Sequence, residues 1–187
     1  FSQSLLCLQI TFPQPHEWSS NVIVSVDGVH CRFHEEKHAT LAKNPENYSH
    51  KFHGAGISYE LALHLFEPRL VWVQQNPKTS NNDRRNFVQN GLRDQIPPGK
   101  KAITDRAYRG KGGDIKVSAP NSDDAEVLRT FKARARMRQE AFHGRLKRMS
   151  CLTAQFRHGK ERHATCFEAL CILCCYEMEL VSPLFDV

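Results

Sequence analysis

The chain has 187 residues, the length of about one domain. Hydrophobic residues make up 40% of it and charged residues 25%, with 10 Gly and 9 Pro, so collagen-like, low-complexity and largely disordered classes are excluded. The most apolar stretch, residues 164–181, is interrupted by three Glu residues, and the first 15 residues lack the basic segment of a signal peptide. We therefore expect a folded globular domain, with no membrane span or secretory signal within these residues.

The positive charge is concentrated in one segment. The whole chain has 26 Lys and Arg against 20 Asp and Glu, a net charge of +6. Residues 129–162 alone contain 11 Lys or Arg and only 2 Glu, which leaves the rest of the chain net negative. Such a segment is typical of a protein that binds a polyanion, nucleic acid first of all. The alternative is an ordinary solvated helix face, because basic runs are common on protein surfaces.

The cysteines indicate a reducing compartment. Their number is odd, and four of them fall within ten consecutive residues of one predicted helix. Neither feature suits a disulfide framework. The seven are Cys7, Cys31, Cys151, Cys166, Cys171, Cys174 and Cys175. The cytosol or the nucleus is therefore favoured.

The first predicted elements are strands. Residues 21–30 contain a nearly unbroken run of Val and Ile, which predicts a central strand covered on both faces. Residues 56–66 and 69–75 predict two more strands, joined through Glu67-Pro68. This connection is short enough for an antiparallel hairpin.

A helix is predicted next, over residues 82–92. Asn81 or Asn82 is its expected N-cap, and Gly91 lies near its end. It is the first helix predicted in the chain, after three predicted strands.

The second half of the chain is predicted to add short strands and long helices. Short strands are expected over residues 101–105 and 114–119. Asp123 and Glu126 resemble a capping box, and the proline-free basic sequence that follows predicts one long or two consecutive helices. Residues 160–180 predict a last helix, with apolar side chains at helical spacing.

This order of elements predicts the fold class. Strands, then helix, strand, strand and helices give a mixed sheet flanked by helices, an α/β domain. We expect residues 1–20 to be a lead-in segment and residues 21–187 to form a single domain, without internal repeats.

Two aspartates are predicted to lie at strand ends. Asp27 ends the apolar run of the central strand, and Asp105 ends the short strand that begins at Lys101. Sites in open α/β sheets are built at strand ends, and two neighbouring carboxylates repel each other unless a cation lies between them. The pair therefore predicts a hard divalent cation with oxygen ligands.

Glu140 is an acid within the basic helix. At helical spacing it shares a face with Arg136, His143, Gly144 and Lys147. If this face meets the sheet, Glu140 completes a three-carboxylate metal site with cations beside it. Gly144 lowers helix propensity, which a close approach of backbone or substrate would explain.

Structural alternatives exist for all three acids. The VDG sequence at Asp27 is also typical of a turn, and Asp105 is a possible helix cap. Glu140 is also at the right spacing for an ion pair with Arg136. By count alone, two aspartates and a glutamate do not separate these alternatives from a metal site.

Six segments in order carry a resemblance to a known family: VDGVH, NYSHKFHGAGISYELAL, VWVQQNPKTSNNDRRNF, ITDRAYRG, RQEAFHGRLKRM and FRHGKERHATCF. Their order and spacing resemble the DDE endonuclease domain of PIF/Harbinger-type transposases over residues 20–186. The resemblance implies a ribonuclease H-like fold. It also implies that the catalytic, metal-binding acids are Asp27, Asp105 in the D-x-x-Y-x-G segment and Glu140 in the E-x-x-x-G-x-x-K segment.

The resemblance further implies a metal-dependent DNA endonuclease. Two Mg²⁺ ions, for which Mn²⁺ is a substitute, would support phosphodiester cleavage. Asp27 would bridge both ions, while Asp105 and Glu140 would each hold one. The freed 3′-hydroxyl can then attack a second DNA, which is strand transfer.

The same resemblance implies partners and a location. DNA is the expected substrate, a separate DNA-reading domain or protein is expected to choose the target, and an oligomer is possible. The nucleus is the expected location. Basic side chains of the long helix are expected to follow the DNA backbone without reading its sequence. They are Arg134, Arg136, Arg138, Arg145, Lys147 and Arg148.

Two other metal patterns were weighed. Residues 34–38, HEEKH, match the short HExxH pattern, but they follow a strand directly and lack a helical face, so a surface loop is favoured over a zinc protease. Cys151, His158, His163 and Cys166 have ligand types suited to structural zinc, although they do not form a paired CxxC framework.

Two rival functions are left open by the sequence. One is a domesticated descendant that binds DNA or a partner without cleaving, and the other is a decayed fragment that folds poorly. The intact acids favour the nuclease over both.

Overall fold

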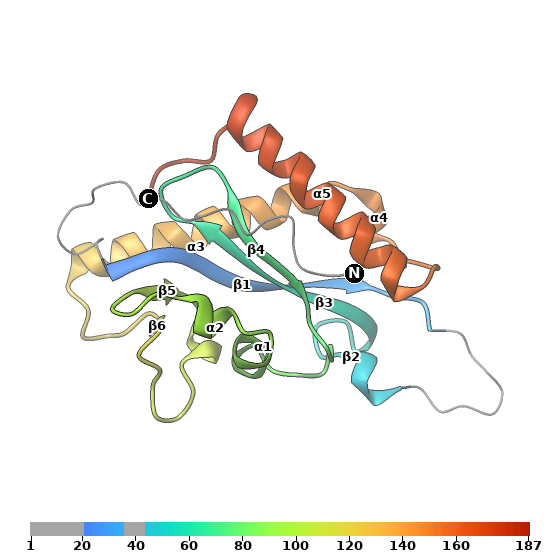
Figure 1. Cartoon of the computed structure of the whole chain (residues 1–187), viewed down its shortest axis with the longest axis horizontal. Helices are drawn as coiled ribbons and strands as arrows, with labels where there is room; N and C mark the ends of the chain where they lie inside the picture. The colour runs from blue at the N-terminus through green and yellow to red at the C-terminus, as the bar shows by residue number, and fades with distance from the viewer. Residues whose placement is uncertain (1–20, 36–43) are drawn as a thin grey trace.

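The computed structural model describes residues 21–35 and 44–187. A mixed six-stranded sheet forms the middle of the molecule, with helices on both faces (Figure 1). The α/β class predicted from the order of elements is confirmed. The predicted lead-in, residues 1–20, lies outside the described residues.

The sheet combines antiparallel and parallel pairs. Its strands run in the order β2-β3-β1-β5-β6, and β4 also pairs with β3. β1 is antiparallel to β3 and parallel to β5, which confirms the central position predicted for it. The strands are β1 (Val22–Arg32), β2 (Tyr48–Ser49), β3 (Gly54–His64), β4 (Leu70–Gln75), β5 (Lys101–Ile103) and β6 (Val117–Ser118).

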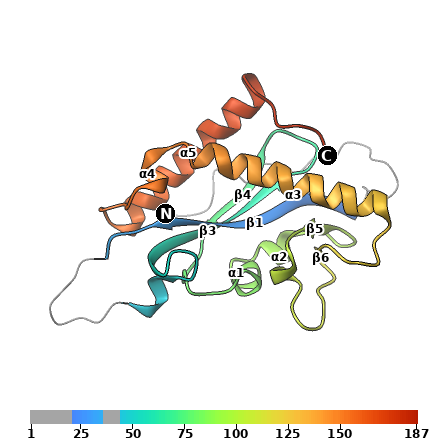
Figure 2. The same ribbon diagram turned by 180° about the vertical axis from the view of Figure 1, so that it is seen from behind.

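The helices are divided between the two faces of the sheet. α3, α4 and α5 cover one face, and α1 and α2 cover the other (Figures 1 and 2). The helices are α1 (Asp83–Gln89), α2 (Leu92–Gln95), α3 (Glu126–Leu146), α4 (Ser150–Thr153) and α5 (Lys160–Leu180), with short 3-10 helices η2 (Pro45–Asn47) and η3 (Arg106–Tyr108).

β1 supplies apolar side chains to both cores. Val29 packs with Phe142 of α3 and Phe167 of α5. Val26 packs on the opposite face with Phe87 of α1. Because side chains alternate along a strand, Asp27 shares its face with Val29 and lies on the α3 side.

Local sequence signals located several elements correctly. β3 and β4 form the predicted antiparallel hairpin. The side chain of Asn82 accepts a hydrogen bond from Arg85 N at 2.8 Å and caps α1, and Gly91, with φ of 85°, separates α1 from α2. The last helix spans the predicted residues 160–180.

The expected start of the basic helix is wrong in detail. α3 begins after Ala125 without a side-chain cap, so Asp123 and Glu126 do not form a capping box. Asp124 instead accepts hydrogen bonds from Asn121 N and from Lys132 Nζ. α3 is one helix that continues through Gly144, and a Cβ atom at Gly144 would meet open space within the described residues. The described part of the chain makes no close approach there, and an approach of substrate stays a prediction.

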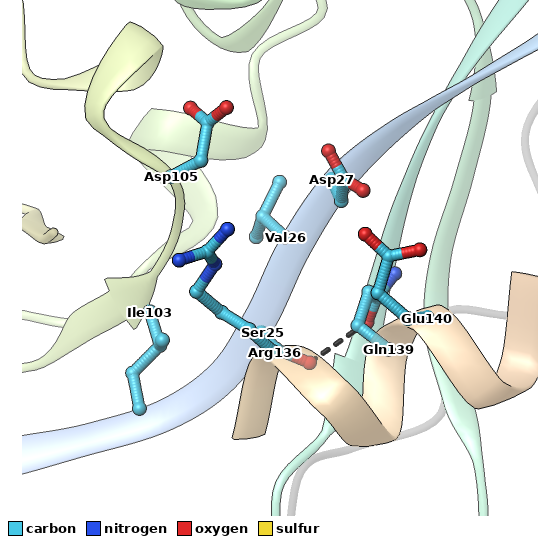
Figure 3. Close-up of a pocket in the computed structure, with 8 residues that line it drawn as sticks. All are labelled: Ser25, Val26, Asp27, Ile103, Asp105, Arg136, Gln139 and Glu140. Carbon is cyan, nitrogen blue, oxygen red and sulfur yellow. Dashed lines mark hydrogen bonds between the residues drawn. The ribbon is translucent and has the colours of Figure 1, made fainter. Parts of the chain in front are cut away.

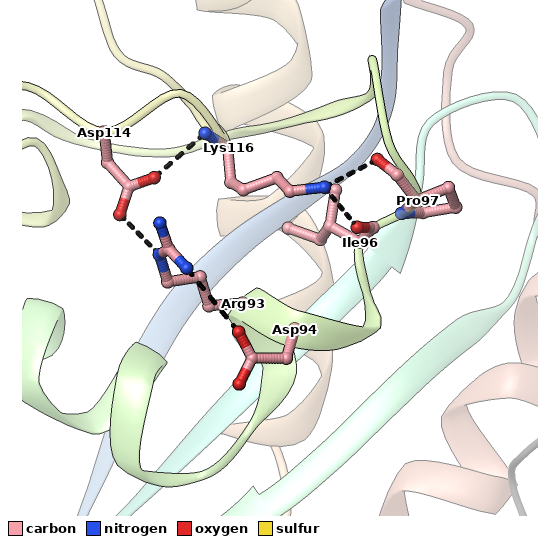
Figure 4. Close-up of polar contacts among 6 residues, drawn as sticks. All are labelled: Arg93, Asp94, Ile96, Pro97, Asp114 and Lys116. Atoms are coloured by element: carbon pink, nitrogen blue, oxygen red, sulfur yellow. Dashed lines mark hydrogen bonds and ion pairs between the residues drawn. The ribbon is translucent and has the colours of Figure 1, made fainter.

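A polar cluster holds the segment before β6 against α2 (Figure 4). The buried carboxylate of Asp114 accepts a hydrogen bond from Arg93 Nε at 2.8 Å. Lys116 Nζ donates to the carbonyl oxygens of Ile96 and Pro97 at 2.6 and 2.8 Å. Charge-assisted hydrogen bonds of this kind satisfy buried ionic groups. The cluster therefore fixes the polypeptide that follows Asp105.

Membrane insertion has no support from the helices. Across residues 21–35 and 44–187, none of them combines the length and the apolar character needed to cross a bilayer.

Candidate active site

The parallel pairing of β1 with β5 brings two aspartates together. Ser25 of β1 is the register partner of Ile103 of β5. Asp27 and Asp105 each lie two residues further along, so both follow the paired segment at the same level. They are far apart in the sequence, and the sheet makes them neighbours.

Helix α3 brings the third acid to the same place. Ser25 Oγ donates a hydrogen bond to Gln139 Oε1 at 2.7 Å, which fastens α3 over β1. Glu140, the next residue, points toward Asp27 (Figure 3). One pocket of about 140 Å³ is lined by all three acids, the full set being Ser25, Val26, Asp27, Ile103, Asp105, Arg136, Gln139 and Glu140. This volume suits ions with a few water molecules and is smaller than the about 300 Å³ at which small-molecule sites begin.

The local structure decides between the alternatives for two acids. β1 continues to Arg32, so Asp27 lies within the strand and neither ends it nor opens a turn. Its Oδ1 accepts a hydrogen bond from Gly28 N at 2.8 Å. Asp105 does cap η3, because its Oδ1 accepts from Ala107 N at 2.7 Å. Capping holds the Asp105 side chain beside the pocket.

Glu140 is not an ion-pair partner of Arg136 within the described residues. Both side chains line the pocket from successive turns of α3, and the Arg136 guanidinium extends toward Asp105 (Figure 3). The pocket is therefore lined by three carboxylates and one guanidinium group, that of Arg136.

The electrostatics of the pocket centre on Asp27. Burial raises the pKa of the Asp27 carboxyl from 3.8 to about 6, against the effect of the Gly28 hydrogen bond. The negative charges of Asp83, Asp105 and Glu140 raise this pKa further. A cation placed among these groups would remove the repulsion and favour the ionised form.

Asp83 is a fourth carboxylate that the sequence patterns did not single out. It is the first residue of α1, and a Cβ atom at Gly28 would lie 3.2 Å from its Oδ1, so only glycine leaves this carboxylate normal room beside Asp27. Burial raises the pKa of Asp83, the charge of Asp105 adds to this, and Lys51 opposes it. An acid in the first turn is common in any helix, which is why the sequence gave no distinct signal.

The D-x-x-Y-x-G segment has a structural explanation. Tyr108 is buried and packs edge-to-face on Phe87, with ring centroids 5.7 Å apart. Gly110 has φ of 64°, and a Cβ atom there would clash with the guanidinium of Arg84. Both residues therefore support the turn that carries Asp105.

His143 lies on the other side of Asp27. Its side chain is 3% exposed, and its Nδ1 is 3.5 Å from Asp27 Oδ2. Burial, followed by the positive charges of Lys147 and Lys51, lowers the pKa of His143 to about 3, so the ring is neutral at physiological pH. Helical spacing predicts His143 on the same face of the helix as Glu140 but indicates no partner for it.

The donor set fits a hard divalent cation. Carboxylate oxygens are the ligands that Mg²⁺ and Mn²⁺ prefer, and here mutually repelling carboxylates surround one small pocket. The ligands are not fully assembled, since in the described part of the chain no three His, Cys, Asp or Glu side chains are arranged to hold an ion. Cation binding therefore requires the carboxylates to draw together.

The comparison with protein families agrees with this pocket. The model of a family described as DDE superfamily endonuclease matches residues 26–174. The chain belongs to this DDE endonuclease family. The matched region begins one residue before Asp27 and includes Asp105 and Glu140. No curated protein and no solved structure matches the chain.

The basic residues of this member of the DDE endonuclease family divide between two edges of α3 and of the turn that follows it. We define the site edge as Arg136, Glu140, His143 and Lys147, and the tail edge as Arg134, Arg138, Arg145 and Arg148. The site edge borders the pocket, because Arg136 and Glu140 line it and Lys147 acts electrostatically on His143. The tail edge lies roughly opposite around the helix, since 100° separates successive residues.

Most residues predicted to bind DNA lie on the tail edge and have other partners. Arg138 is 4% exposed and donates to the carbonyl oxygens of His64 and Glu67, so it is unavailable to DNA and the expectation for it is wrong. Arg148 forms an ion pair with Glu177 at 2.6 Å.

The other two arginines of the tail edge contact the C-terminal segment. Arg134 Nη2 donates to Asp186 O at 2.6 Å, and Arg145 Nη2 donates to Ser182 Oγ at 3.4 Å. Of the six basic side chains, only Arg136 lines the described pocket, and Lys147 acts electrostatically on the neighbouring His143.

The two other metal patterns do not form sites in the described part of the endonuclease. Cys151 and Cys166 approach to 3.7 Å between sulfurs, but His163 Nδ1 is hydrogen-bonded to Tyr59 OH at 2.6 Å, and the set is not arranged to hold an ion. In HEEKH, Glu35 accepts a hydrogen bond from Asn47 Nδ2 at 2.7 Å. Residues 36–38 of that motif lie outside the described residues.

Proposed function

We propose that the chain is the catalytic domain of a PIF/Harbinger-type transposase, a metal-dependent DNA endonuclease with a ribonuclease H-like fold that acts in the nucleus. Three antiparallel pairs and two parallel pairs among the described strands, with helices on both faces, support this fold. The six ordered segments from VDGVH to FRHGKERHATCF support the subtype. Membership of the DDE endonuclease family supports DNA cleavage.

One observation carries the proposal. Asp27, Asp105 and Glu140 come from a strand, a strand end and a helix, and all three line one small pocket. A fold has no structural need to place Asp105 and Glu140 where their charges raise the pKa of Asp27. Cation binding provides the compensation.

In this proposal Asp27, Asp105 and Glu140 hold Mg²⁺ or Mn²⁺, and Asp83 adds negative charge beside Asp27. Bound divalent cations neutralise charge on the phosphate, activate water and support the leaving alkoxide. Arg136, which extends into the same pocket, donates to a nonbridging oxygen of the DNA. The chain itself supplies no nucleophile, and a freed 3′-hydroxyl occupies the position of water during strand transfer.

The DNA backbone is proposed to cross the pocket beside Lys147 and Lys51. Both lysines are exposed, and their charges lower the pKa of His143, whose Nδ1 is 3.5 Å from Asp27 Oδ2, which supports this path. Contacts of this type position DNA without reading its sequence. Target choice is assigned to a separate DNA-reading domain or protein.

Plasmid nicking tests the proposal. The wild-type chain is expected to convert supercoiled DNA to nicked circles with Mg²⁺ or Mn²⁺ and to stop when EDTA is added. Asp27→Asn, Asp105→Asn and Glu140→Gln are each expected to reduce nicking at least ~100-fold, because each removes charge that the cations require.

Matched controls use acids outside the pocket. Asp94→Asn on α2 and Glu126→Gln on α3 change exposed side chains that do not line it, and both are expected to nick like wild type. Nicking that survives EDTA, or pocket variants as active as these controls, would contradict the proposal.

A second candidate is a non-cleaving module that binds DNA or a partner. The observation in its favour is that the described carboxylates are not yet arranged as a metal group. Gel-shift measurements distinguish the two functions. The module predicts DNA binding that is indifferent to Mn²⁺ and to Asp105→Ala, and no nicking.

A further inference from the structure

His143 ends a buried series of hydrogen bonds, and its ring faces Asp27. The series begins at Ser25, passes through Gln139 and reaches the His143 ring. Ser25, Gln139 and His143 are all buried, at 2–3% exposure. Polar groups buried this deeply are held by their partners, so each link constrains the next.

The hydrogen bond between Ser25 and Gln139 sets which groups donate and which accept along this series of hydrogen bonds. Ser25 has a single hydroxyl proton and two acceptors within reach, Gln139 Oε1 at 2.7 Å and Leu63 O at 3.5 Å. The shorter distance assigns the proton to Gln139. The Gln139 oxygen is thereby used as an acceptor, and its amide nitrogen faces the histidine.

The second link sets the tautomer of His143. Gln139 Nε2 lies 3.2 Å from His143 Nε2, and an amide nitrogen can only donate. The ring nitrogen Nε2 must then be the acceptor, so the ring proton is on Nδ1. Nδ1 is the atom that faces Asp27 Oδ2 at 3.5 Å.

The last link acts on the proposed metal ligand. Oδ1 of Asp27 accepts from Gly28 N at 2.8 Å, and Oδ2 faces the Nδ1–H of His143. The hydrogen bond to one oxygen and the ring nitrogen that faces the other orient the carboxylate, while each oxygen keeps a lone pair for a cation. A separation of 3.5 Å is long for a hydrogen bond, as is common before substrate and metal are bound.

We propose that His143 is a positioning residue that holds the Asp27 carboxylate in its cation-binding orientation through an Nδ1–H donor, whose tautomer is set by Gln139 and Ser25. This inference rests on the proposed metal-dependent nuclease function. It adds an outer donor to the three acids, and outer donors of this type change metal affinity or activity by about 10–100-fold when they are removed.

The tautomer is tested without metal or DNA. Histidine labelled with ¹⁵N gives long-range ¹H–¹⁵N correlations that distinguish Nδ1–H from Nε2–H, and the spectrum of His143→Asn identifies the His143 signals among the 10 histidines. The expected result is the Nδ1–H form in the wild type. An Nε2–H form would overturn the proposal.

Two substitutions separate positioning from packing. The amide nitrogen of Asn can occupy the place of Nδ1, whereas that of Gln occupies the place of Nε2, so only His143→Asn retains a donor toward Asp27. His143→Gln is expected to need about 10–100 times more Mn²⁺ for half-maximal nicking, with the KM for DNA unchanged and kcat lowered. His143→Asn is expected to restore most of the Mn²⁺ dependence.

A matched control is the buried histidine of α5. His163 is fully buried against Tyr59 and does not line the acidic pocket, so His163→Asn tests the general effect of losing a buried ring. It is expected to lower the melting temperature and to leave the Mn²⁺ dependence of the folded protein at the wild-type value. Mn²⁺ dependence in His143→Gln equal to that of this control would overturn the proposal.

The two proposals fail in different ways. If the wild type does not nick DNA with any divalent cation, the nuclease function fails, and Mn²⁺ titration by electron paramagnetic resonance together with the tautomer still tests His143. If the wild type nicks and binds Mn²⁺ while His143→Gln matches it in both, only the role of His143 is overturned.

Discussion

The site edge and the tail edge of α3 carry similar basic side chains with different partners. On the tail edge, Arg138 and Arg148 bind backbone carbonyls or a carboxylate of the same chain. On the site edge, Arg136 and Lys147 form no ion pair within the described residues, and Arg136 lines the acidic pocket. One edge joins α3 to the rest of the fold, and the other is available to a polyanion.

The difference shows that the role of a basic side chain depends on the direction in which it points from the helix, more than on the number of charges in the segment. Residues 129–162 carry a large positive excess, but helix geometry turns Arg134, Arg138 and Arg145 of α3 away from the acids. A basic helix can therefore serve stability along one edge and DNA binding along the other.

The largest expected effect on stability comes from the tail edge. Arg138→Ala leaves the buried carbonyl oxygens of His64 and Glu67 without their donor and is expected to lower the free energy of unfolding by about 2–4 kcal/mol. Urea denaturation measures this loss, with Arg134→Ala as an exposed control on the same edge. A fully stable Arg138→Ala protein that has lost DNA binding would reverse the assignment of the edges.

DNA affinity tests the difference between the two edges through variants of the site edge. The double variant Arg136→Ala/Lys147→Ala is expected to weaken DNA binding about 10-fold at physiological salt and to reduce the salt slope by about 2, because two phosphate contacts are lost. Arg134→Ala/Arg148→Ala removes the same charge from the tail edge. Fluorescence anisotropy across a salt series should leave this control near wild type, and equal losses in both would contradict the division.

The pH dependence of stability tests the acidic pocket beside the site edge. The pKa of Asp27 is about 6 in the folded protein and 3.8 ordinarily, so the protonated form favours folding. This stabilisation is complete below pH 3.8 and is lost as the pH rises through 6. Asp27→Asn should therefore stabilise the metal-free protein at pH 7.5 by about 1 kcal/mol, after allowance for the third of the side chain that is exposed.

Thermal unfolding of wild type and Asp27→Asn from pH 4 to 8 measures this effect. The two curves should converge toward pH 4 and separate above pH 6. An Asp27→Asn variant that is less stable than wild type at pH 7.5 would show that the Asp27 carboxylate is not destabilised by its neighbours.

The smallest effect is expected at an exposed ion pair of the tail edge. Arg148, just after α3, and Glu177 of α5 form an ion pair at 2.6 Å, but both side chains are partly exposed. A double-mutant cycle of Arg148→Ala and Glu177→Ala is expected to give a coupling of less than about 1 kcal/mol. A coupling of several kcal/mol would mean that this edge contributes more to stability than its exposure indicates.

Much of the fold was predictable because its signals are local. The Val and Ile run of β1, the Glu67-Pro68 connection and the apolar spacing of α5 depend on neighbouring residues only. The capping box at Asp123 failed because Asp124 bonds to Lys132, a contact made across a turn of α3. Side-chain contacts of this kind are not encoded by spacing alone.

The candidate site was predictable in part. The three acids were predicted to meet, and they line one pocket, although Asp27 lies inside β1 instead of at its end. Asp83 and His143 were not assigned to the site, because their proximity to Asp27 depends on how α1 and α3 pack on the sheet. The catalytic roles of the acids stay predictions.

The most direct test of the central claim is a crystal structure of the protein soaked in Mn²⁺, with the ions located by anomalous scattering. We expect anomalous peaks in the pocket, from ions bound to carboxylate oxygens of Asp27, Asp105 and Glu140. A well-ordered pocket without such peaks at saturating Mn²⁺, or ions bound only elsewhere, would contradict it.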